Sequence, residues 1–225
     1  MNFPQPEDYI DIHNHGSMPV TGKFSIENLM AHEGMIPDYQ PGLAYSIGIH
    51  PWHLTAEDYK AQLDNVEKHA AHPNVIALGE AGFDRLKGPS PELQRTTFEE
   101  QVRIADENSK PLFIHCVRAW EELIAENKKL KPSTIWIIHG FRGKRELARQ
   151  LISKGMLLSF WFDFVLRPES GELLKSLPKE RIFLETDGSG VDITTMYNKV
   201  ASDLEVSVEE LKRLIYSNYK NVFGG

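Results

Sequence analysis

The chain alternates between short runs that are almost wholly apolar and longer segments in which apolar residues recur every three or four positions. Eight such runs are rich in branched and aromatic residues, which is typical of strands buried on both faces of a parallel sheet. The predicted strands cover residues 9–15, 23–30, 43–50, 75–82, 111–117, 134–141, 156–162 and 182–188. The second run differs from the others, because Phe24 and Ile26 give it a partial alternation of apolar and polar positions.

Between the later strands the apolar spacing becomes helical. Apolar residues at positions 59, 63, 66 and 70, and again at 98, 102 and 105, would share one face of a helix. Ser90 before Pro91 is a helix-start signal, and Ser207 with Glu210 predicts a capping box for the last helix. Helices that alternate with strands indicate a parallel sheet with crossover helices.

The front of the chain departs from this alternation. Residues 16–42 contain no convincing helical pattern and are interrupted by seven glycines and prolines, namely Gly16, Pro19, Gly22, Gly34, Pro37, Pro41 and Gly42. The predicted fold class is therefore α/β, a TIM-type (β/α)8 barrel whose first two β/α crossovers are abbreviated. We expect a single domain that spans residues 1–225.

Polar side chains with metal-binding chemistry stand at or near the ends of five of these strands. They are His13, His15, Glu80, His115, His139 and Asp187. Catalytic residues of parallel barrels come from the C-terminal ends of several strands, and side chains two apart on a strand share a face. Imidazoles and carboxylates together suit zinc or a similar divalent ion. A pair of ions is bridged best by a carboxylate, for which Glu80 is the candidate.

Composition and charge indicate the class of protein, its binding partners and its location. With 41% hydrophobic and 25% charged residues the chain has an ordinary globular composition, and no apolar stretch reaches the length of a membrane span. A net charge of −7 argues against tight non-specific binding of nucleic acid, so a phosphate-bearing partner would be gripped locally. The single Cys116 and an N-terminus without signal-peptide features predict a reducing, cytoplasmic location. No obligate protein partner is evident.

Seven motifs along the chain resemble the TatD family of metal-dependent hydrolases, within the amidohydrolase superfamily. In chain order they are DIHNH (11–15), GIHPW (48–52), LGEAGFD (78–84), FIHCVRA (113–119), IHGFRG (138–143), LETD (184–187) and NYKNVFG (218–224). The resemblance covers nearly the whole chain. Each motif is weak alone, and the seven in order are specific.

The resemblance implies an activity and a set of ligands. The family hydrolyses phosphodiesters of DNA, often from the 3′ end, with metal-activated water. One ion would take His13, His15 and Asp187, and the other His115 and His139, with Glu80 between them. Asp187 and Glu80 would be the catalytic residues, with Asp187 accepting the proton of the attacking water. The two divalent ions would be zinc, manganese, nickel or magnesium, according to supply.

Several positions depart from the family pattern. Arg85, Arg118 and Arg142 lie just beyond ligand-bearing strands, where the family usually has other residues or an arginine one position away. Because guanidinium groups bind phosphate in a bidentate manner, these arginines are predicted to form a phosphate-binding rim. His50 is a further candidate for substrate binding. The loop that begins at Gly188 lacks a proline expected there, so a more open groove for short oligonucleotides or a small phosphoester is a further hypothesis.

Other residues have structural interpretations. Asp84 is taken as orienting a loop or ligand, Glu185 as a residue behind the ligands, and the four tryptophans mainly as core, although Trp161 with Phe162 is placed to line a groove. Three functions remain open. The first is a two-metal phosphodiesterase or deoxyribonuclease acting on DNA or a small phosphoester, the second a metal-dependent amide or ester hydrolase, and the third a metal-binding protein without catalysis.

Overall fold

The computed structural model describes residues 3–34 and 36–224, and its eight strands are parallel and pair in chain order. The strands are β1 (Tyr9–Asn14), β2 (Lys23–Met30), β3 (Leu43–Gly48), β4 (Val75–Asp84), β5 (Leu112–Val117), β6 (Trp136–Ile138), β7 (Leu157–Trp161) and β8 (Ile182–Glu185). All eight predicted strands are present. The partial alternation in β2 is also confirmed, because Phe24, Ile26 and Asn28 are buried between more accessible neighbours.

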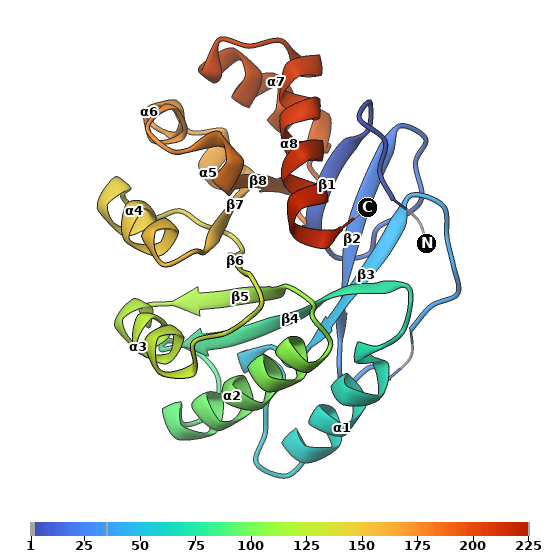
Figure 1. Ribbon diagram of the computed structural model, residues 1–225, viewed down its shortest axis with the longest axis vertical. Helices are drawn as coiled ribbons and strands as arrows, with labels where there is room; N and C mark the ends of the chain where they lie inside the picture. Colours follow the sequence, from blue (N-terminus) through green and yellow to red (C-terminus); the bar gives the residue numbers. More distant parts are fainter. Residues whose placement is uncertain (1–2, 35, 225) are drawn as a thin grey trace. The chain divides into compact units, whose positions relative to one another are not determined.

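Helices follow most of the strands (Figure 1). They are α1 (Tyr59–Ala70), α2 (Pro91–Glu107), α3 (Trp120–Leu130), α4 (Arg145–Ser153), α5 (Phe162–Val165), α6 (Ser170–Lys175), α7 (Ile193–Leu204) and α8 (Val208–Phe223), with 3₁₀ turns at Pro51–His53 and Lys179–Arg181. The predicted helix starts are confirmed. Ser90 accepts a hydrogen bond from the Leu93 amide, and Ser207 and Glu210 form a capping box. In the described part of residues 16–42 there is no helix, so the first two crossovers are indeed abbreviated.

The chain divides into two compact units. The terminal unit comprises Met1–Glu27, Tyr39–Ala44 and His139–Gly225, and the central unit comprises Asn28–Asp38 and Tyr45–Ile138. In the terminal unit, α7 and α8 pack against β1 and β8 (Figure 1). In the central unit, α1 and α2 pack against β4 and against each other. Each unit thus has apolar helix faces on parallel strands, as the alternation of patterns predicts.

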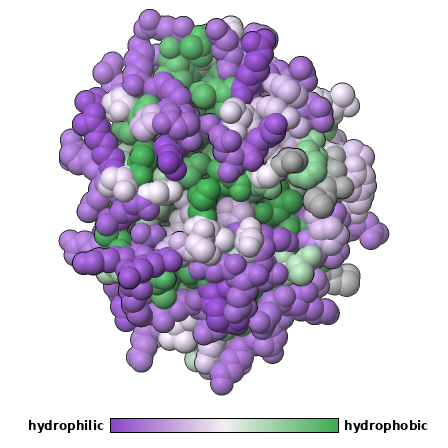
Figure 2. All heavy atoms as spheres, in the orientation of Figure 1, coloured by the Kyte–Doolittle hydropathy of each residue, from purple (hydrophilic) through white to green (hydrophobic). Residues whose placement is uncertain are grey.

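The interior of each unit is apolar and aromatic. Phe83, Phe98 and Trp136 are almost fully buried in the central unit and their rings contact one another in series. Phe141, Phe160 and Phe164 form a similar series in the terminal unit. Burying a side chain of this size contributes about 1.5–3 kcal/mol. The face drawn in Figure 2 is mostly hydrophilic, and none of the described helices has the length and apolar composition needed to cross a bilayer.

A half-buried lysine closes the end of α1. Lys110 donates hydrogen bonds to the carbonyl oxygens of Ala70, His72 and Val75, which follow or end that helix. We expect Lys110→Met to lower the free energy of unfolding by about 3 kcal/mol, because three carbonyl groups lose a charged donor. Urea unfolding measures the change. Lys128→Met, at an exposed position of α3, is the matched control and should shift stability by less than about 0.5 kcal/mol. Equal unfolding midpoints for the two variants would show that the Lys110 contacts contribute nothing.

Candidate functional site

The ends of β1 and β8 are joined by hydrogen bonds at the point where the chain carries candidate ligand side chains. The Asp187 amide donates to the carbonyl oxygen of His13 over 3.1 Å. One residue earlier, Thr186 donates from its amide (3.1 Å) and its hydroxyl to the buried carboxyl group of Asp11. Burial raises the pKa of Asp11 to about 7, although the hydrogen bonds from Thr186 act in the opposite direction. These contacts hold Asp187 beside the strand that carries His13.

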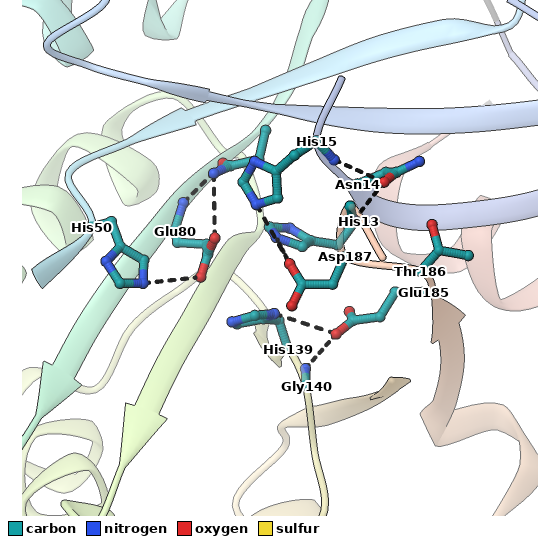
Figure 3. A network of polar contacts seen from close by, with 12 residues as sticks. His13, Asn14, His15, His50, Glu80, His139, Gly140, Glu185, Thr186 and Asp187 are labelled. Carbon is teal, nitrogen blue, oxygen red and sulfur yellow. Dashed lines mark hydrogen bonds and ion pairs between the residues drawn. The ribbon is translucent and has the colours of Figure 1, made fainter. Parts of the chain in front are cut away.

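Four predicted ligands lie together in the terminal unit: His13, His15, His139 and Asp187, which we call the terminal cluster. Oδ1 of Asp187 is 3.6 Å from Nε2 of His13 and 3.4 Å from Nε2 of His15 (Figure 3). The His13 ring lies 5.1 Å from the His15 ring and 4.6 Å from the His139 ring, measured between centroids. The side chain of His13 is fully buried, whereas those of His15 and Asp187 are 32% and 25% exposed. The cluster is therefore open to solvent on one side.

The spacing in the terminal cluster fits a bound metal ion. Hydrogen bonds between nitrogen and oxygen are usually 2.7–3.2 Å long. Two ligands each about 2.1 Å from a tetrahedral ion are about 3.4 Å apart. The observed separations of 3.4 and 3.6 Å agree with the second value and exceed the first. Two imidazoles and one carboxylate are also a donor set that suits zinc and similar divalent ions.

Glu185 sets the orientation of His139. Its side chain is fully buried, and its Oε1 accepts a hydrogen bond from the Gly140 amide and lies 3.3 Å from Nδ1 of His139 (Figure 3). A carboxylate on Nδ1 places the ring proton there and leaves Nε2 as the coordinating nitrogen. This agrees with the interpretation of Glu185 as a residue that contacts a candidate ligand and does not itself bind the metal.

The central unit brings together His50, Glu80 and His115, which we call the central cluster. Oε2 of Glu80 is 3.5 Å from Nε2 of His50 and 3.4 Å from Nδ1 of His115, and the two histidine nitrogens are 3.1 Å apart. All three side chains are buried. By distance alone, each of them is a possible ligand of one ion.

Hydrogen bonds to the far side of each ring distinguish the two histidines of the central cluster. Nε2 of His115 faces Oδ2 of Asp84 at 3.3 Å, so the proton lies on Nε2 and the lone pair of Nδ1 points to Glu80. Nδ1 of His50 accepts a hydrogen bond from the Trp52 amide over 3.0 Å, so its proton lies on Nε2. With these tautomers His50 donates from Nε2 to the Nδ1 lone pair of His115 over 3.1 Å, so His50 offers an N–H and His115 the lone pair that a metal would need. This favours the predicted substrate-binding role of His50 over a role as ligand.

Asn28 holds Glu80 in place and was not recognised as a functional residue from the sequence. Its Oδ1 accepts hydrogen bonds from the Glu80 amide (3.0 Å) and the Ser46 hydroxyl (2.9 Å), and its Nδ2 lies 3.4 Å from Oε1 of Glu80. Asn28 occupies the buried face of β2 after Phe24 and Ile26. An amide at an otherwise apolar face position was the signal available in the sequence.

Asp84 is a positioning residue for His115. Its Oδ1 accepts hydrogen bonds from the Leu86 and Lys87 amides, and its Oδ2 accepts one from Nε1 of Trp52 over 2.7 Å. Burial would raise the pKa of Asp84, but the hydrogen bonds outweigh burial and hold the pKa below its usual range. Asp84 is therefore a carboxylate with two roles. It binds the amides of the following loop through Oδ1, and it can orient His115 through Oδ2.

The comparisons with known proteins decide the family. The model of the TatD-related DNase family matches residues 16–224. The chain belongs to the TatD-related DNase family. The predicted family is thus confirmed. In the terminal cluster His13, His15 and Asp187, and in the central cluster all three residues, lie close enough together to hold a metal ion, as a metal-dependent member requires.

Curated relatives within the TatD-related family include nucleases. The 3′-5′ ssDNA/RNA exonuclease TatD of Pantoea vagans is 30% identical over 177 residues, 76% of this chain and 66% of that protein. The human 3′-5′ RNA nuclease TATDN2 is 35% identical over 150 residues, 63% of this chain and 19% of that protein. The chain therefore spans less than two thirds of the length of either relative.

A solved structure shows the shared fold. A TatD homologue from Escherichia coli matches with a TM-score of 0.79 over 98% of this chain and 100% of that one, at 19% identity. Together with eight parallel strands paired in chain order, this likeness confirms the predicted (β/α)8 fold class.

The three predicted rim arginines of this TatD-related chain have different surroundings. Arg85 forms an ion pair with Glu122, which also binds Arg95, so its charge is partly compensated within the central unit. Arg118 is exposed at the end of β5. In the terminal unit, the guanidinium carbon of Arg142 lies 5.3 Å from the centroid of the Trp161 ring. Phosphate binding by these arginines stays a prediction.

Replacing Asp84 tests whether it orients His115. We expect Asp84→Asn to lower metal affinity or kcat by about 10–100-fold, because an amide holds the His115 ring and its tautomer less well. Asp106→Asn, at a carboxylate that accepts hydrogen bonds from Ser133 and Thr134 in the same unit, is the matched control. Metal titration monitored by calorimetry and steady-state kinetics measure the effect. If the two variants had equal metal affinity and kcat, the orienting role would be excluded.

Proposed function

We propose that this chain is a metal-dependent phosphodiesterase that cleaves single-stranded nucleic acid. The observation that carries the proposal is the terminal cluster, in which two imidazoles surround one carboxylate oxygen at ligand spacing in a member of the TatD-related family. The names of the Pantoea and human relatives agree with nucleic acid as the substrate. The predicted cytoplasmic location is kept as part of this proposal.

The proposed site uses the six ligands that the family resemblance implies. His13, His15 and Asp187 would hold one divalent ion, His115 and His139 the second, and Glu80 would bridge them. Support comes from each unit separately, since the tautomers inferred for His139 and His115 each leave one nitrogen for coordination. Zinc, manganese, nickel and magnesium are the candidate ions.

The side chains have distinct tasks in the proposed reaction. Bound divalent ions supply Lewis-acid activation of water and neutralise charge on the phosphoryl group. Asp187 accepts the proton of the attacking water, and its 25% exposed side chain lies where solvent reaches the cluster. His50 donates its Nε2 hydrogen to a phosphate oxygen. Arg85, Arg118 and Arg142 bind phosphate oxygens of the substrate. They would provide local positive charge for a polyanionic substrate on a chain whose net charge is −7.

One experiment separates this proposal from its alternatives. The purified chain is analysed for bound metal and assayed with a 3′-labelled single-stranded oligodeoxynucleotide, bis-p-nitrophenyl phosphate, and p-nitroanilide and p-nitrophenyl ester substrates. We expect cleavage of both phosphodiesters, loss of cleavage with a chelator, and recovery with a divalent ion. Cleavage of amides or esters alone would replace the proposal with the second function. Bound metal without any turnover would leave a metal-binding protein.

A further inference from the structure

Trp52 is unexpectedly accessible for a residue predicted to belong mainly to the core. The residue is 46% exposed and lies in the 3₁₀ turn Pro51–His53, shortly after β3. The ammonium group of Lys87 lies over its ring, 3.7 Å from the centroid. Among the described residues no carboxylate forms an ion pair with Lys87. An exposed aromatic ring and an uncompensated ammonium therefore share one surface.

Two histidines extend this basic surface. The rings of His32 and His53 lie 4.7 Å apart with an interplanar angle of 31°, and both side chains are exposed. Burial, followed by the charges of His32 and Lys87, lowers the pKa of His53, while the charges of Glu33 and Glu80 act in the opposite direction. His32 and Lys87 thus lie close enough to act on the charge of His53. In a chain with a net charge of −7, one lysine beside two histidines is a local group of basic side chains that favours an anion.

The same surface adjoins the central cluster within the central unit. Nε1 of Trp52 donates to Oδ2 of Asp84, the oxygen that faces His115. The ring of Trp52 lies 4.9 Å from the His50 ring and 6.0 Å from the His115 ring. The His50 and His53 rings are 6.1 Å apart. The Trp52 ring thus contacts the central cluster through His50 and Lys87 through its ammonium group, so one molecule can contact the cluster, the ring and the ammonium group together.

We propose that Trp52, Lys87 and His53 form a subsite for the nucleotide next to the scissile phosphodiester. The flanking phosphate binds Lys87 and His53. The flexible Lys87 side chain moves from the Trp52 ring towards this phosphate, and the unstacked base then lies on the ring. This inference rests on the proposed function and gives a structural reason for its preference for a single strand. A base in a duplex is already stacked and cannot lie on an aromatic side chain.

Kinetics on two substrates test the subsite. The metal-loaded chain is assayed with a single-stranded hexanucleotide, which carries flanking nucleotides, and with bis-p-nitrophenyl phosphate, which has none. For Lys87→Gln and for His53→Gln, we expect the ratio of kcat/KM for the hexanucleotide to that for bis-p-nitrophenyl phosphate to fall about tenfold. Lys128→Gln, at an exposed position on α3, is the matched control and should leave the ratio unchanged. Unfolding curves establish that each variant is folded.

Binding without cleavage gives an independent measurement. Fluorescence anisotropy of a labelled hexathymidylate with the metal-free chain, prepared with a chelator, should show weaker binding for Lys87→Gln. The slope of log Kd against log salt should also fall by about 0.7, the contribution of one phosphate contact on a single strand. A duplex of the same length should bind more weakly than the single strand.

The outcomes distinguish this inference from the proposed function. If the wild-type chain cleaves neither phosphodiester, the proposed function fails and the subsite falls with it. If the wild type cleaves both and the two variants keep the wild-type ratio, only the subsite is overturned. Equal losses on both substrates would also overturn it, because the side chains would then act on the scissile phosphate itself.

Discussion

Asp187→Asn should lower kcat/KM on bis-p-nitrophenyl phosphate and on single-stranded DNA by at least about a thousandfold. Losses of this size are typical when a catalytic side chain is removed. Asparagine has nearly the same shape but no charge, so it binds a divalent cation weakly and accepts no proton from water. Oδ1 of Asp187 lies 3.6 and 3.4 Å from Nε2 of His13 and His15, so the substitution removes the negative charge at the centre of the terminal cluster.

The fold should survive this substitution. Asp187 has a φ of 50°, in the left-handed region that asparagine also tolerates well. Its amide still donates to the carbonyl oxygen of His13, and the contacts of Thr186 with Asp11 do not involve it. Thermal unfolding of the metal-free variant should therefore match that of the metal-free wild type.

Asp203→Asn is the matched control for Asp187→Asn. It makes the same chemical change in α7 of the same unit, where the carboxylate pairs with Lys199 on one helix face. We expect wild-type kinetics, because a pair of this kind contributes about 0.3–0.5 kcal/mol to stability and nothing to the site. Metal content measured by mass spectrometry should fall in Asp187→Asn alone. Undiminished turnover in Asp187→Asn would remove this carboxylate from the reaction.

The strands and the grouping of the candidate ligands were predictable because the local sequence determines both burial and side-chain chemistry. Runs such as PLFIHCV are apolar except for one residue at the end, and that exception, His115, is a member of the central cluster. Four of the six predicted ligands meet in the terminal unit, and the other two, Glu80 and His115, meet in the central unit. Chain order and the C-terminal ends of parallel strands account for both results.

The residues that support the ligands were less predictable because their roles depend on side-chain direction. Asn28 is 52 residues from Glu80 in sequence, and only the pairing of the strands brings its amide to that carboxylate. The sequence predicts Trp52 to be mainly core, yet the residue is exposed because its indole N–H reaches Asp84 from the surface. The donor role of His50 depends on a hydrogen bond from a backbone amide, which no spacing in the sequence specifies. Strand ends also shifted, since β6 occupies only Trp136–Ile138 of the predicted 134–141.

Gly82→Ala should destabilise the central unit by about 3–5 kcal/mol, the upper range for a single substitution. Gly82 of β4 is in register with His115 of β5, and an added Cβ would lie 1.9 Å from the carbonyl oxygen of His115. This oxygen belongs to the backbone and cannot move aside without separating the two strands. Glu80 and Asp84 lie two positions either side of Gly82, so the same displacement would misplace both carboxylates relative to His115.

Gly155→Ala separates the steric effect at Gly82 from the conformational one. Gly155 has a φ of 87°, which alanine adopts only with strain, but nothing lies within 4 Å of its added Cβ. We expect a cost of about 1 kcal/mol there, the usual penalty for an alanine in this region. Urea unfolding and phosphodiesterase kinetics should thus rank the wild type above Gly155→Ala, and both far above Gly82→Ala. If the two alanine variants were equally stable, the close approach of β4 to β5 would not be what requires glycine at position 82, and the positioning of Glu80 and His115 would need another cause.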